Sequence, residues 1–300
     1  MKHLHMLVGN PTHASAIPAT LGKLIARSHP LAGPASHGMS ATLARLFGLA
    51  ARDLPALLLA AEGIEAGSQA WFRADPVHLM AGMHSITLFD SRHFPLHEEE
   101  TSALIATLNA HFAGQAEFLA PHPTRWYARF QKPLTVEAPP LDQVAGGSVG
   151  LDFIDGPDTR ELQRTAMEIQ MLLHDHPVNV EREAANRASI NGVWLWGGCP
   201  MRKPAAAFQR IYADDFTTQA LALAAGVRQE KVPDPLDPAA IESDTLVVLE
   251  EADEAWFELA LSSLQRGRID RLTLTRPGHP DCRLDRWQSL RFWRNQVPVR

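Results

Sequence analysis

The sequence predicts an α/β protein into which an α+β domain is inserted. Strand-length apolar runs alternate with helical patterns near both ends of the chain, as in an α/β core. In the middle, strands and helices follow in mixed order and include a hairpin pattern. The length of 300 residues fits one large domain or two. We therefore expect a core domain over residues 1–64 and 189–300, and an inserted domain over residues 65–188.

The first segment is rich in alanine and leucine. The apolar run at residues 4–8 predicts a buried strand that Gly9-Asn10-Pro11 ends. Helical patterns follow at residues 17–26 and 41–59, and Pro55 interrupts the second.

Strand-forming residues become frequent near Trp71. A helical pattern at residues 98–111 separates two groups of strands, and a Pro- and Gly-rich loop at 133–147 precedes the last. Strands are expected at residues 71–79, 86–90, 116–119, 126–130 and 149–154.

The stretch over residues 158–198 organises the chain. Asp158 stands three residues before Glu161, which is a capping-box spacing, and the helix that follows ends at Pro177. A polar cluster comes next, and the apolar run at 190–196 predicts a buried strand. Polar groups at a helix end beside a strand end are common in ligand sites.

The last third of the chain returns to the α/β pattern. Helices are expected at residues 214–225, 254–265 and 286–294, and strands at 246–249 and 269–275.

Composition limits the function classes. A net charge of −6 argues against general nucleic-acid binding. Cys199 and Cys282 show neither disulfide nor metal-ligand spacing, which favours a reducing compartment. The apolar run at 54–61 is far shorter than the roughly 20 residues that span a membrane. We expect a cytoplasmic protein without a membrane partner.

The C-terminal tail differs from the rest. Residues 266–300 hold nine arginines and three aspartates, interleaved with Trp287, Phe292 and Trp293. Such a tail can bind single-stranded nucleic acid. An amphipathic closing helix with a solvated arginine face explains it more simply, and an acidic protein partner is a further alternative.

Short motifs also recur in a familiar order over residues 70–235. They are Phe72-Arg73-Ala74-Asp75, Phe89-Asp90-Ser91, Glu98-Glu99-Glu100, Thr124-Arg125-Trp126, Pro139-Pro140-Leu141-Asp142, His176-Pro177-Val178-Asn179 with Arg182, and the run from Asn191 to Gly198. Together they resemble the substrate domain of archaeal-type, cofactor-independent phosphoglycerate mutases. That family belongs to the alkaline-phosphatase superfamily, so the resemblance implies a reduced alkaline-phosphatase-like core. Residues 71–79, 174–179 and 290–293 resemble the bacterial RpfE-type regulatory proteins more closely.

The catalytic positions depart from this resemblance. The mutases use a serine nucleophile and two divalent metals held by Asp and His. Here Val8-Gly9-Asn10, Leu249-Glu250 and Gly278-His279-Pro280 stand where ligands are expected, although Asp253-Glu254-Ala255 is retained. Two divalent cations need several carboxylate and imidazole ligands. We therefore expect no metal, no cofactor and no catalytic residue, which favours a pseudoenzyme.

Arg73 and Arg125 stand where the resemblance implies arginines that hold phosphoglycerate. A guanidinium binds phosphate or carboxylate through two parallel hydrogen bonds. The alternative is pairing with a nearby acid such as Asp75 or Asp142.

The polar cluster after residue 173 also has two interpretations. His174, Asp175 and His176 could bind a metal or transfer protons, but histidines at a helix C-terminus more often cap it. For Asn179, Arg182 and Asn191, we favour hydrogen bonds from the side chain to the backbone, which would fix the boundary between the lobes. Direct contact with a ligand is the less favoured interpretation. Trp194 and Trp196 are expected to pack in the core. The predicted ligand-binding set is Arg73, Arg125, Asp142, His176, Asn179, Arg182 and Asn191.

The sequence thus predicts a non-catalytic, phosphoglycerate-mutase-like regulatory or ligand-sensing protein with a residual anion-binding lobe. Its expected ligand is a small phosphorylated or carboxylate molecule. One alternative is an active metal-dependent mutase or phosphatase. Another is a protein-interaction module that uses the basic C-terminal face.

Overall fold

The chain forms two compact units, and the second is inserted into the first. Unit 1 comprises Met1–Gly48 and Lys203–Arg300, and unit 2 comprises Leu49–Arg202. The expected fold class, an α/β core with an inserted α+β domain, is confirmed. The boundaries differ from residues 65 and 188, because both segments beyond them pack on the central strand of unit 2. The computed structural model describes residues 2–9, 17–33, 35–82, 85–149, 153–233, 241, 244–291 and 293–294.

Unit 1 is built on a seven-stranded sheet in the order β10-β9-β11-β1-β12-β13-β2. Strand β1 (His3–Val8) lies between β11 (Thr245–Leu249) and β12 (Arg271–Thr275) and runs parallel to both. Strand β13 is antiparallel to β12, so the sheet is mixed. The other strands are β2 (His29–Pro30), β9 (Arg210–Tyr212), β10 (Arg228–Glu230) and β13 (Cys282–Asp285).

The helices of unit 1 begin where the sequence supplies N-caps. Asp215 accepts a hydrogen bond from the Thr218 amide at the start of α8, and Asp253 accepts one from the Ala255 amide at the start of α9. Leu4 and its neighbours on β1 pack with α1 and α9 in one apolar core. The helices are α1 (Ala19–Arg27), α2 (Met39–Leu46), α8 (Phe216–Ala225), α9 (Glu254–Gln265) and α10 (Arg286–Ser289).

The final helix is shorter than the expected range of residues 286–294. Arg27 donates to the carbonyl oxygens of Ser289, at 2.7 Å, and Arg294, at 3.3 Å. These bonds satisfy carbonyls after the first helical turn, so the chain leaves the helix there. Phe292 lies outside the described residues.

Unit 2 contains a six-stranded sheet with the path β5-β6-β3-β4-β7, and β8 pairs with β3. The β3 strand is long enough to pair with β6, β4 and β8, all in the antiparallel sense. The strands are β3 (Trp71–Ala81), β4 (Ile86–Phe89), β5 (Ala116–His122), β6 (Arg125–Phe130), β7 (Ser148–Val149) and β8 (Gly192–Cys199).

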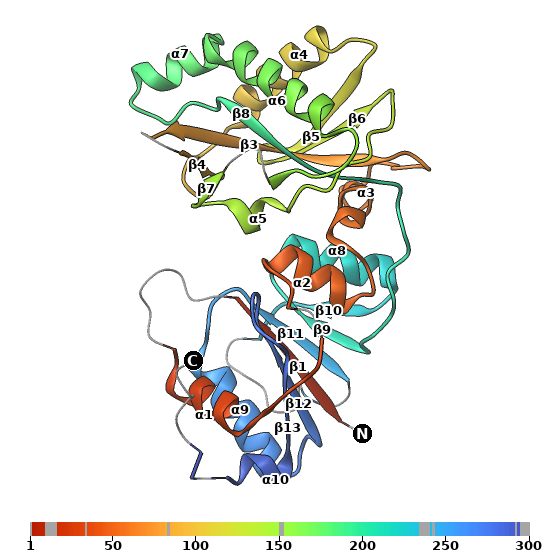
Figure 1. Cartoon of the computed structure of the whole chain (residues 1–300). Coiled ribbons are helices and arrows are strands. Elements are labelled where there is room, and N and C mark those ends of the chain that lie inside the picture. Colours follow the sequence, from red (N-terminus) through yellow and green to blue (C-terminus); the bar gives the residue numbers. More distant parts are fainter. Residues whose placement is uncertain are drawn as a thin grey trace. The chain divides into compact units, whose positions relative to one another are not determined.

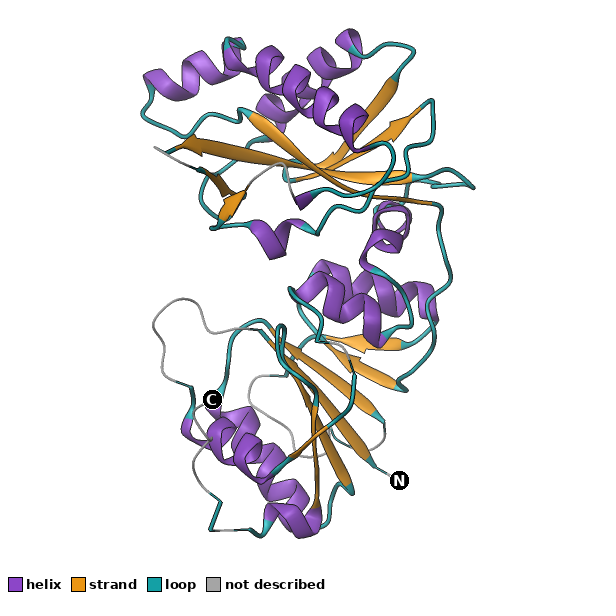
Figure 2. Cartoon of the chain, viewed as in Figure 1, coloured by secondary structure: helices purple, strands orange, loops and turns teal. Residues whose placement is uncertain are grey.

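Helices lie on both faces of this sheet. Figure 1 shows α4, α6 and α7 above one face, and α3 and α5 on the other; Figure 2 shows the same layers by secondary structure. Apolar side chains of α4 and α6, among them Leu108 and Ile169, form one core with Phe72 and Trp126. The helices of unit 2 are the 3-10 helix η1 (Ala51–Asp53), α3 (Leu54–Ala61), α4 (Glu98–His111), α5 (Leu141–Val144), α6 (Thr159–His174) and α7 (Pro177–Ala184).

Three expectations for unit 2 need correction. Pro177 was expected only to stop a helix, but it also begins α7, where a missing N–H costs no hydrogen bond. The expected loop at 133–147 contains the short helix α5. Of the strand expected at 149–154, β7 includes only Val149, and residues 150–152 lie outside the described part.

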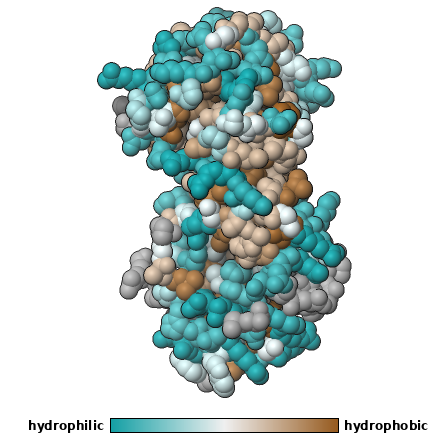
Figure 3. Space-filling view, turned by 90° about the vertical axis from the view of Figure 1, so that its right-hand side faces the viewer, coloured by the Kyte–Doolittle hydropathy of each residue, from teal (hydrophilic) through white to brown (hydrophobic). Residues whose placement is uncertain are grey.

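One face of the molecule is mainly hydrophilic. In the face shown in Figure 3, polar residues cover most of both units and hydrophobic residues show in patches. Among the described residues, no helix combines the length and the apolar composition needed to cross a membrane.

Candidate functional site

The central strand of unit 2 has one apolar face and one polar face. Arg73 on β3 lies directly opposite Tyr127 on β6 and Trp196 on β8. Directly paired residues of an antiparallel sheet point to the same face, so these three side chains converge. Phe72 and Ala74 point to the other face and join the core beneath α4 and α6. The polar face is therefore the candidate site.

Arg73 is the centre of a buried hydrogen-bond network. Only 8% of this residue is exposed. Its Nε donates to Asp75 Oδ1 at 3.0 Å, its Nη2 also contacts that oxygen, and its Nη1 donates to the Tyr127 hydroxyl at 3.4 Å. The indole N–H of Trp196 donates to Asp75 Oδ2 at 2.7 Å. Both carboxylate oxygens of Asp75 are thus bonded, as a buried charge requires.

The same network determines the protonation states. Burial acts to lower the pKa of Arg73, but Asp75 and Tyr127 outweigh it and raise the pKa above its ordinary value. Burial raises the pKa of Tyr127 to about 12. At neutral pH the site therefore contains a guanidinium cation and a neutral phenol.

Arg125 extends the polar face. It stands two residues before Tyr127 on β6, so its side chain leaves the same face of the sheet. Its Nε donates to Glu62 Oε1, and its Nη2 donates to Glu62 Oε2 at 3.2 Å. The Arg125 side chain remains 26% exposed, against 9% for Glu62. Solvent therefore reaches Arg125 more readily than its ion-pair partner Glu62.

The charges of Arg73 and Arg125 both act on the imidazole of His122. Burial lowers the pKa of His122, and the charges of Arg125 and Arg73 lower it further, while Glu62 opposes them. Its Nδ1 accepts a hydrogen bond from the Thr124 amide at 3.2 Å. The structure thus brings the predicted pair, Arg73 and Arg125, into one electrostatic neighbourhood, which we call the arginine cluster: Arg73, Arg125, Asp75, Glu62, His122, Tyr127 and Trp196.

Asn179 lies elsewhere, under the turn between α6 and α7. It is fully buried. Its Nδ2 donates to the carbonyl oxygens of Leu173 at 2.7 Å and Ile190 at 2.9 Å, and its Oδ1 accepts from the Ile190 amide at 2.7 Å. The side chain thus binds backbone inside unit 2, where it ties the end of α6 to the start of β8.

Arg182 is also fully buried. It donates to the carbonyl oxygens of Ala188 at 2.7 Å and Pro95 at 3.0 Å, and to the Glu100 carboxylate at 2.8 Å. These contacts hold α7 against the start of α4. The geometry gives Arg182 a packing role on the helix-covered side of the sheet.

His176 caps a helix, but at the opposite end from the one expected. Its Nδ1 accepts from the Val178 amide at 3.2 Å, so it is the N-cap of α7. Its Nε2 lies 3.0 Å from the Thr107 hydroxyl, and burial lowers the pKa of His176. The side chains of His174 and Asp175 are 80% and 95% exposed. The described residues around them therefore show no enclosed site.

The remaining predicted residues are separate from the arginine cluster. Asn191 bonds both backbone groups of Leu79, accepting from its N–H at 2.7 Å and donating to its oxygen at 2.9 Å. Asp142 lies on the surface in α5. The structure therefore joins Arg73 with Arg125 and leaves the other predicted residues outside that group.

Close packing explains the two glycines at the end of β8. Gly197 has a φ of +105°, and a Cβ there would lie 2.3 Å from Pro55 Cγ. At Gly198, with φ of +87°, a Cβ would lie 2.3 Å from Phe72 Cζ. Only glycine allows this approach together with a positive φ.

Five residues of the arginine cluster were not predicted as site residues: Glu62, Asp75, His122, Tyr127 and Trp196. Asp75 was named only as an alternative ion-pair partner of Arg73. Trp196 was expected only as a core residue, and it is buried, but its N–H also binds Asp75. The strand alternation places Trp196 on the face opposite Val193, and only the pairing of β8 with β3 reveals its partner.

The metal positions that the resemblance implies do not suit a divalent cation. A Cβ at Gly9 would lie 2.1 Å from the Glu250 carbonyl oxygen, so the backbone leaves no room for a ligand side chain. Burial lowers the pKa of His279 and the charge of Arg276 lowers it further, so this histidine faces a cation. Asn10 lies outside the described residues. Among the described residues, no group of three or more His, Cys, Asp or Glu side chains could hold a metal.

An acidic cavity lies at the carboxyl end of β11 in unit 1. Its volume is about 480 Å³. Two of its carboxylates bind helix N-termini: Glu254 accepts from the Thr20 amide at 2.9 Å, and Asp253 accepts from the Ala255 amide at 2.9 Å. Without cations, carboxylates repel a phosphorylated acid. The lining acids are Asp214, Glu250, Glu251, Asp253 and Glu254.

Comparison with known proteins gives a distant structural likeness. No family model and no curated protein sequence matches the chain. Among solved structures, the cofactor-independent phosphoglycerate mutase from Thermoplasma acidophilum is similar, with 14% identity, a TM-score of 0.39, and coverage of 95% of this chain and 90% of that one. The PH0037 protein from Pyrococcus horikoshii is similar with 12% identity, a TM-score of 0.49, and coverage of 94% and 86%. Neither likeness assigns an activity to this chain.

Proposed function

We propose that this protein is a non-catalytic, phosphoglycerate-mutase-like regulator that binds a small phosphorylated or carboxylate anion at its arginine cluster. The observation that carries the proposal is the convergence of Arg73 and Arg125 on one face of the sheet in unit 2. A planar guanidinium that is partly open to solvent suits a bidentate oxyanion.

The two arginines have different roles in this proposal. Arg73 is enclosed by Asp75 and Tyr127, so it contributes charge and rigidity without direct access. Arg125 is more exposed and is held by Glu62. An incoming phosphate or carboxylate takes the place of the Glu62 carboxylate on Arg125, because each presents two oxygens that can accept the parallel guanidinium hydrogen bonds.

This exchange supplies a signal. Glu62 is the C-cap residue of α3, so its carboxylate lies beside the end of that helix. Before the anion arrives, the charges cancel within each of the two ion pairs, Arg73–Asp75 and Arg125–Glu62. Once the anion has replaced it on Arg125, the Glu62 carboxylate carries an unpaired charge. A ligand is therefore reported as a change in the charge next to the end of α3.

Support for a regulatory and not a catalytic role comes from unit 1. Gly9 leaves no room for a ligand side chain, and His279 stands beside Arg276. Two carboxylates of the acidic cavity already bind helix amides. The residues that would have to assemble a metal centre therefore make other contacts.

Titration calorimetry with 3-phosphoglycerate tests the binding proposal. We expect saturable binding to the full chain and a loss of about tenfold to a hundredfold in affinity for Arg125→Gln, which removes one charge-assisted bidentate contact. Arg129→Gln is the control, because Arg129 lies on the same strand but binds Glu117 and Gln69. Equal weakening by both variants would indicate a general charge effect and contradict the proposal.

A mutase assay with added manganese separates the regulatory from the catalytic role. We expect no turnover of 3-phosphoglycerate by protein that binds it. Turnover that requires the added metal would instead support the active mutase or phosphatase.

A further inference from the structure

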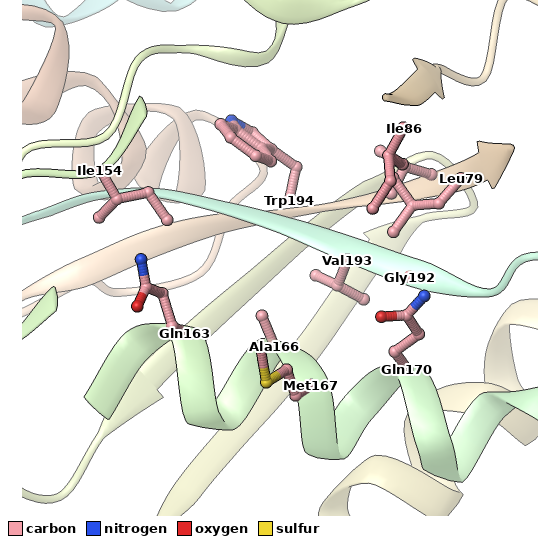
Figure 4. Close-up of a pocket in the computed structure, with 11 residues that line it drawn as sticks. Leu79, Ile86, Ile154, Gln163, Ala166, Met167, Gln170, Gly192, Val193 and Trp194 are labelled. Atoms are coloured by element: carbon pink, nitrogen blue, oxygen red, sulfur yellow. The ribbon is translucent and has the colours of Figure 1, made fainter. Parts of the chain in front are cut away.

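A second concave site lies in unit 2, apart from the arginine cluster. It is a cavity of about 300 Å³ between α6 and the strands β3, β4 and β8. This volume lies at the lower end of the roughly 300–1,000 Å³ of typical ligand pockets. Figure 4 shows residues of α6 on one side and Trp194, Leu79 and Ile86 on the other. None of its lining residues belongs to the arginine cluster.

Among the residues that the structure describes, none with a charged side chain lines the cavity. Apolar side chains dominate it, and the polar groups are the amides of Gln163 and Gln170 and the indole of Trp194. The two glutamines project from α6 toward β8 near opposite ends of the cavity, with Ala166 and Met167 between them (Figure 4). An uncharged apolar wall with a few hydrogen-bonding groups favours a neutral ligand, because a charged one would lose its hydration without compensation.

Two features keep the cavity open and firm. A Cβ at Gly192 would lie 2.9 Å from Leu79 Cδ1 and 3.3 Å from Val77 Cγ2, and both of those side chains line the cavity. The Trp194 indole donates to the Pro139 carbonyl oxygen at 2.9 Å, which fixes its ring at the wall. A ligand therefore meets a wall that is already in place, and less ordering opposes binding.

We propose that this cavity, the α6–β8 pocket, binds a small, neutral, mainly apolar molecule, such as an aromatic or short acyl compound with a hydrogen-bonding group for Gln163 or Gln170. The ligand's apolar body packs against Met167 and Val193, which both line the cavity. Since the pocket and the arginine cluster share no residue, the protein has a second ligand site of opposite chemistry.

Two dyes with the same aromatic skeleton test the chemistry. N-phenyl-1-naphthylamine is neutral, and 8-anilinonaphthalene-1-sulfonate adds one negative charge. Both become fluorescent in apolar surroundings. We expect the neutral dye to bind the full chain at a single site, and the anionic dye to bind at least about tenfold more weakly. Equal or tighter binding of the anionic dye that persists in Arg125→Gln, where the arginine cluster is weakened, would overturn the proposal.

Filling the pocket tests the location. Ala166→Phe places a large side chain between the two glutamines, and we expect it to weaken the neutral dye by at least about tenfold. Ala106→Phe is the matched control, since Ala106 is an exposed alanine of helix α4 in the same unit. Circular dichroism and the melting temperature establish that both variants fold, and Ala166→Leu replaces Ala166→Phe if the latter does not.

Two results would reject the pocket as a small-molecule site. One is dye binding that Ala166→Phe leaves unchanged while the fold persists. The other is a parent protein that elutes as a dimer and a variant that elutes as a monomer, because the cavity would then be a contact between two copies.

Discussion

The indole N–H of Trp196 and the carboxylate of Asp75, which are 121 residues apart, form a hydrogen bond of 2.7 Å. Asp75 also holds Arg73, so Trp196 ties β8 to a buried ion pair within β3. This bond gives the end of β8 a specific place in unit 2. It also holds in place the Asp75 carboxylate that binds Arg73.

Trp196→Phe should therefore destabilise the protein. The phenyl ring retains most of the packing but leaves Asp75 Oδ2 without its donor, and a buried unpaired acceptor costs about 1–3 kcal/mol. Urea unfolding monitored by circular dichroism measures the loss. A variant as stable as the parent would mean that the Trp196–Asp75 bond adds little.

Asn179→Ala should also lower the free energy of unfolding, by roughly 1–3 kcal/mol, because three buried backbone groups lose their partner. Ligand binding should change only through that loss of order. Glu183→Ala on the exposed side of the same helix is the control. A variant that stays stable but fails to bind 3-phosphoglycerate would place Asn179 in the ligand site instead.

Glu62→Gln should raise the affinity for 3-phosphoglycerate. The substitution keeps the shape of the side chain but removes the carboxylate that competes for Arg125. An increase of about tenfold corresponds to about 1.4 kcal/mol, close to the lower end of the roughly 1.5–3 kcal/mol of one charge-assisted contact. Titration calorimetry measures it, and a lower affinity would show that Glu62 supports binding.

A pair of histidines on β1 should make unit 1 sensitive to acid. His3 and His5 are bonded to each other at 3.0 Å, and His3 also lies 2.8 Å from the Thr273 hydroxyl. Burial is the main cause that lowers the pKa of His3 to about 3, and the neighbouring His5 is the second. Burial lowers the pKa of His5 to about 4, although Asp244 and Asp281 oppose it.

The sign of the pH effect follows from these values. The unfolded chain takes up protons at these histidines near pH 6.5, whereas the folded chain resists until about pH 3 to 4. The two neutral histidines leave the folding stability undiminished above pH 6.5, and stability is lost as the pH falls below that value. Arg271 and Arg283 also face His3 and strengthen the effect.

Melting temperatures between pH 7.5 and pH 4.5 measure this loss against His3→Gln, which cannot take up the proton. We expect the parent to lose more stability than the variant over that interval. Parallel curves would show that the histidine pair does not control acid stability. The comparison removes the shared contribution of the carboxylates, which titrate in both proteins.

The sequence by itself determined the elements that depend on local periodicity. The helix expected at 98–111 and the helix expected at 254–265 match α4 (Glu98–His111) and α9 (Glu254–Gln265). Along β8, the alternation of Val193 and Leu195 with Trp194 and Trp196 was also readable. A strand alternates every two residues and a helix turns every 3.6, so a single segment shows its own pattern.

Only the tertiary structure decided which side chains meet. The register that places Arg73 opposite both Tyr127 and Trp196 depends on strand pairing between distant segments. The same holds for Glu62, which reaches Arg125 from a helix 63 residues away. The physical reason is that a hydrogen bond depends on distance in space, and a segment's own pattern shows which face is buried but not which segment covers it.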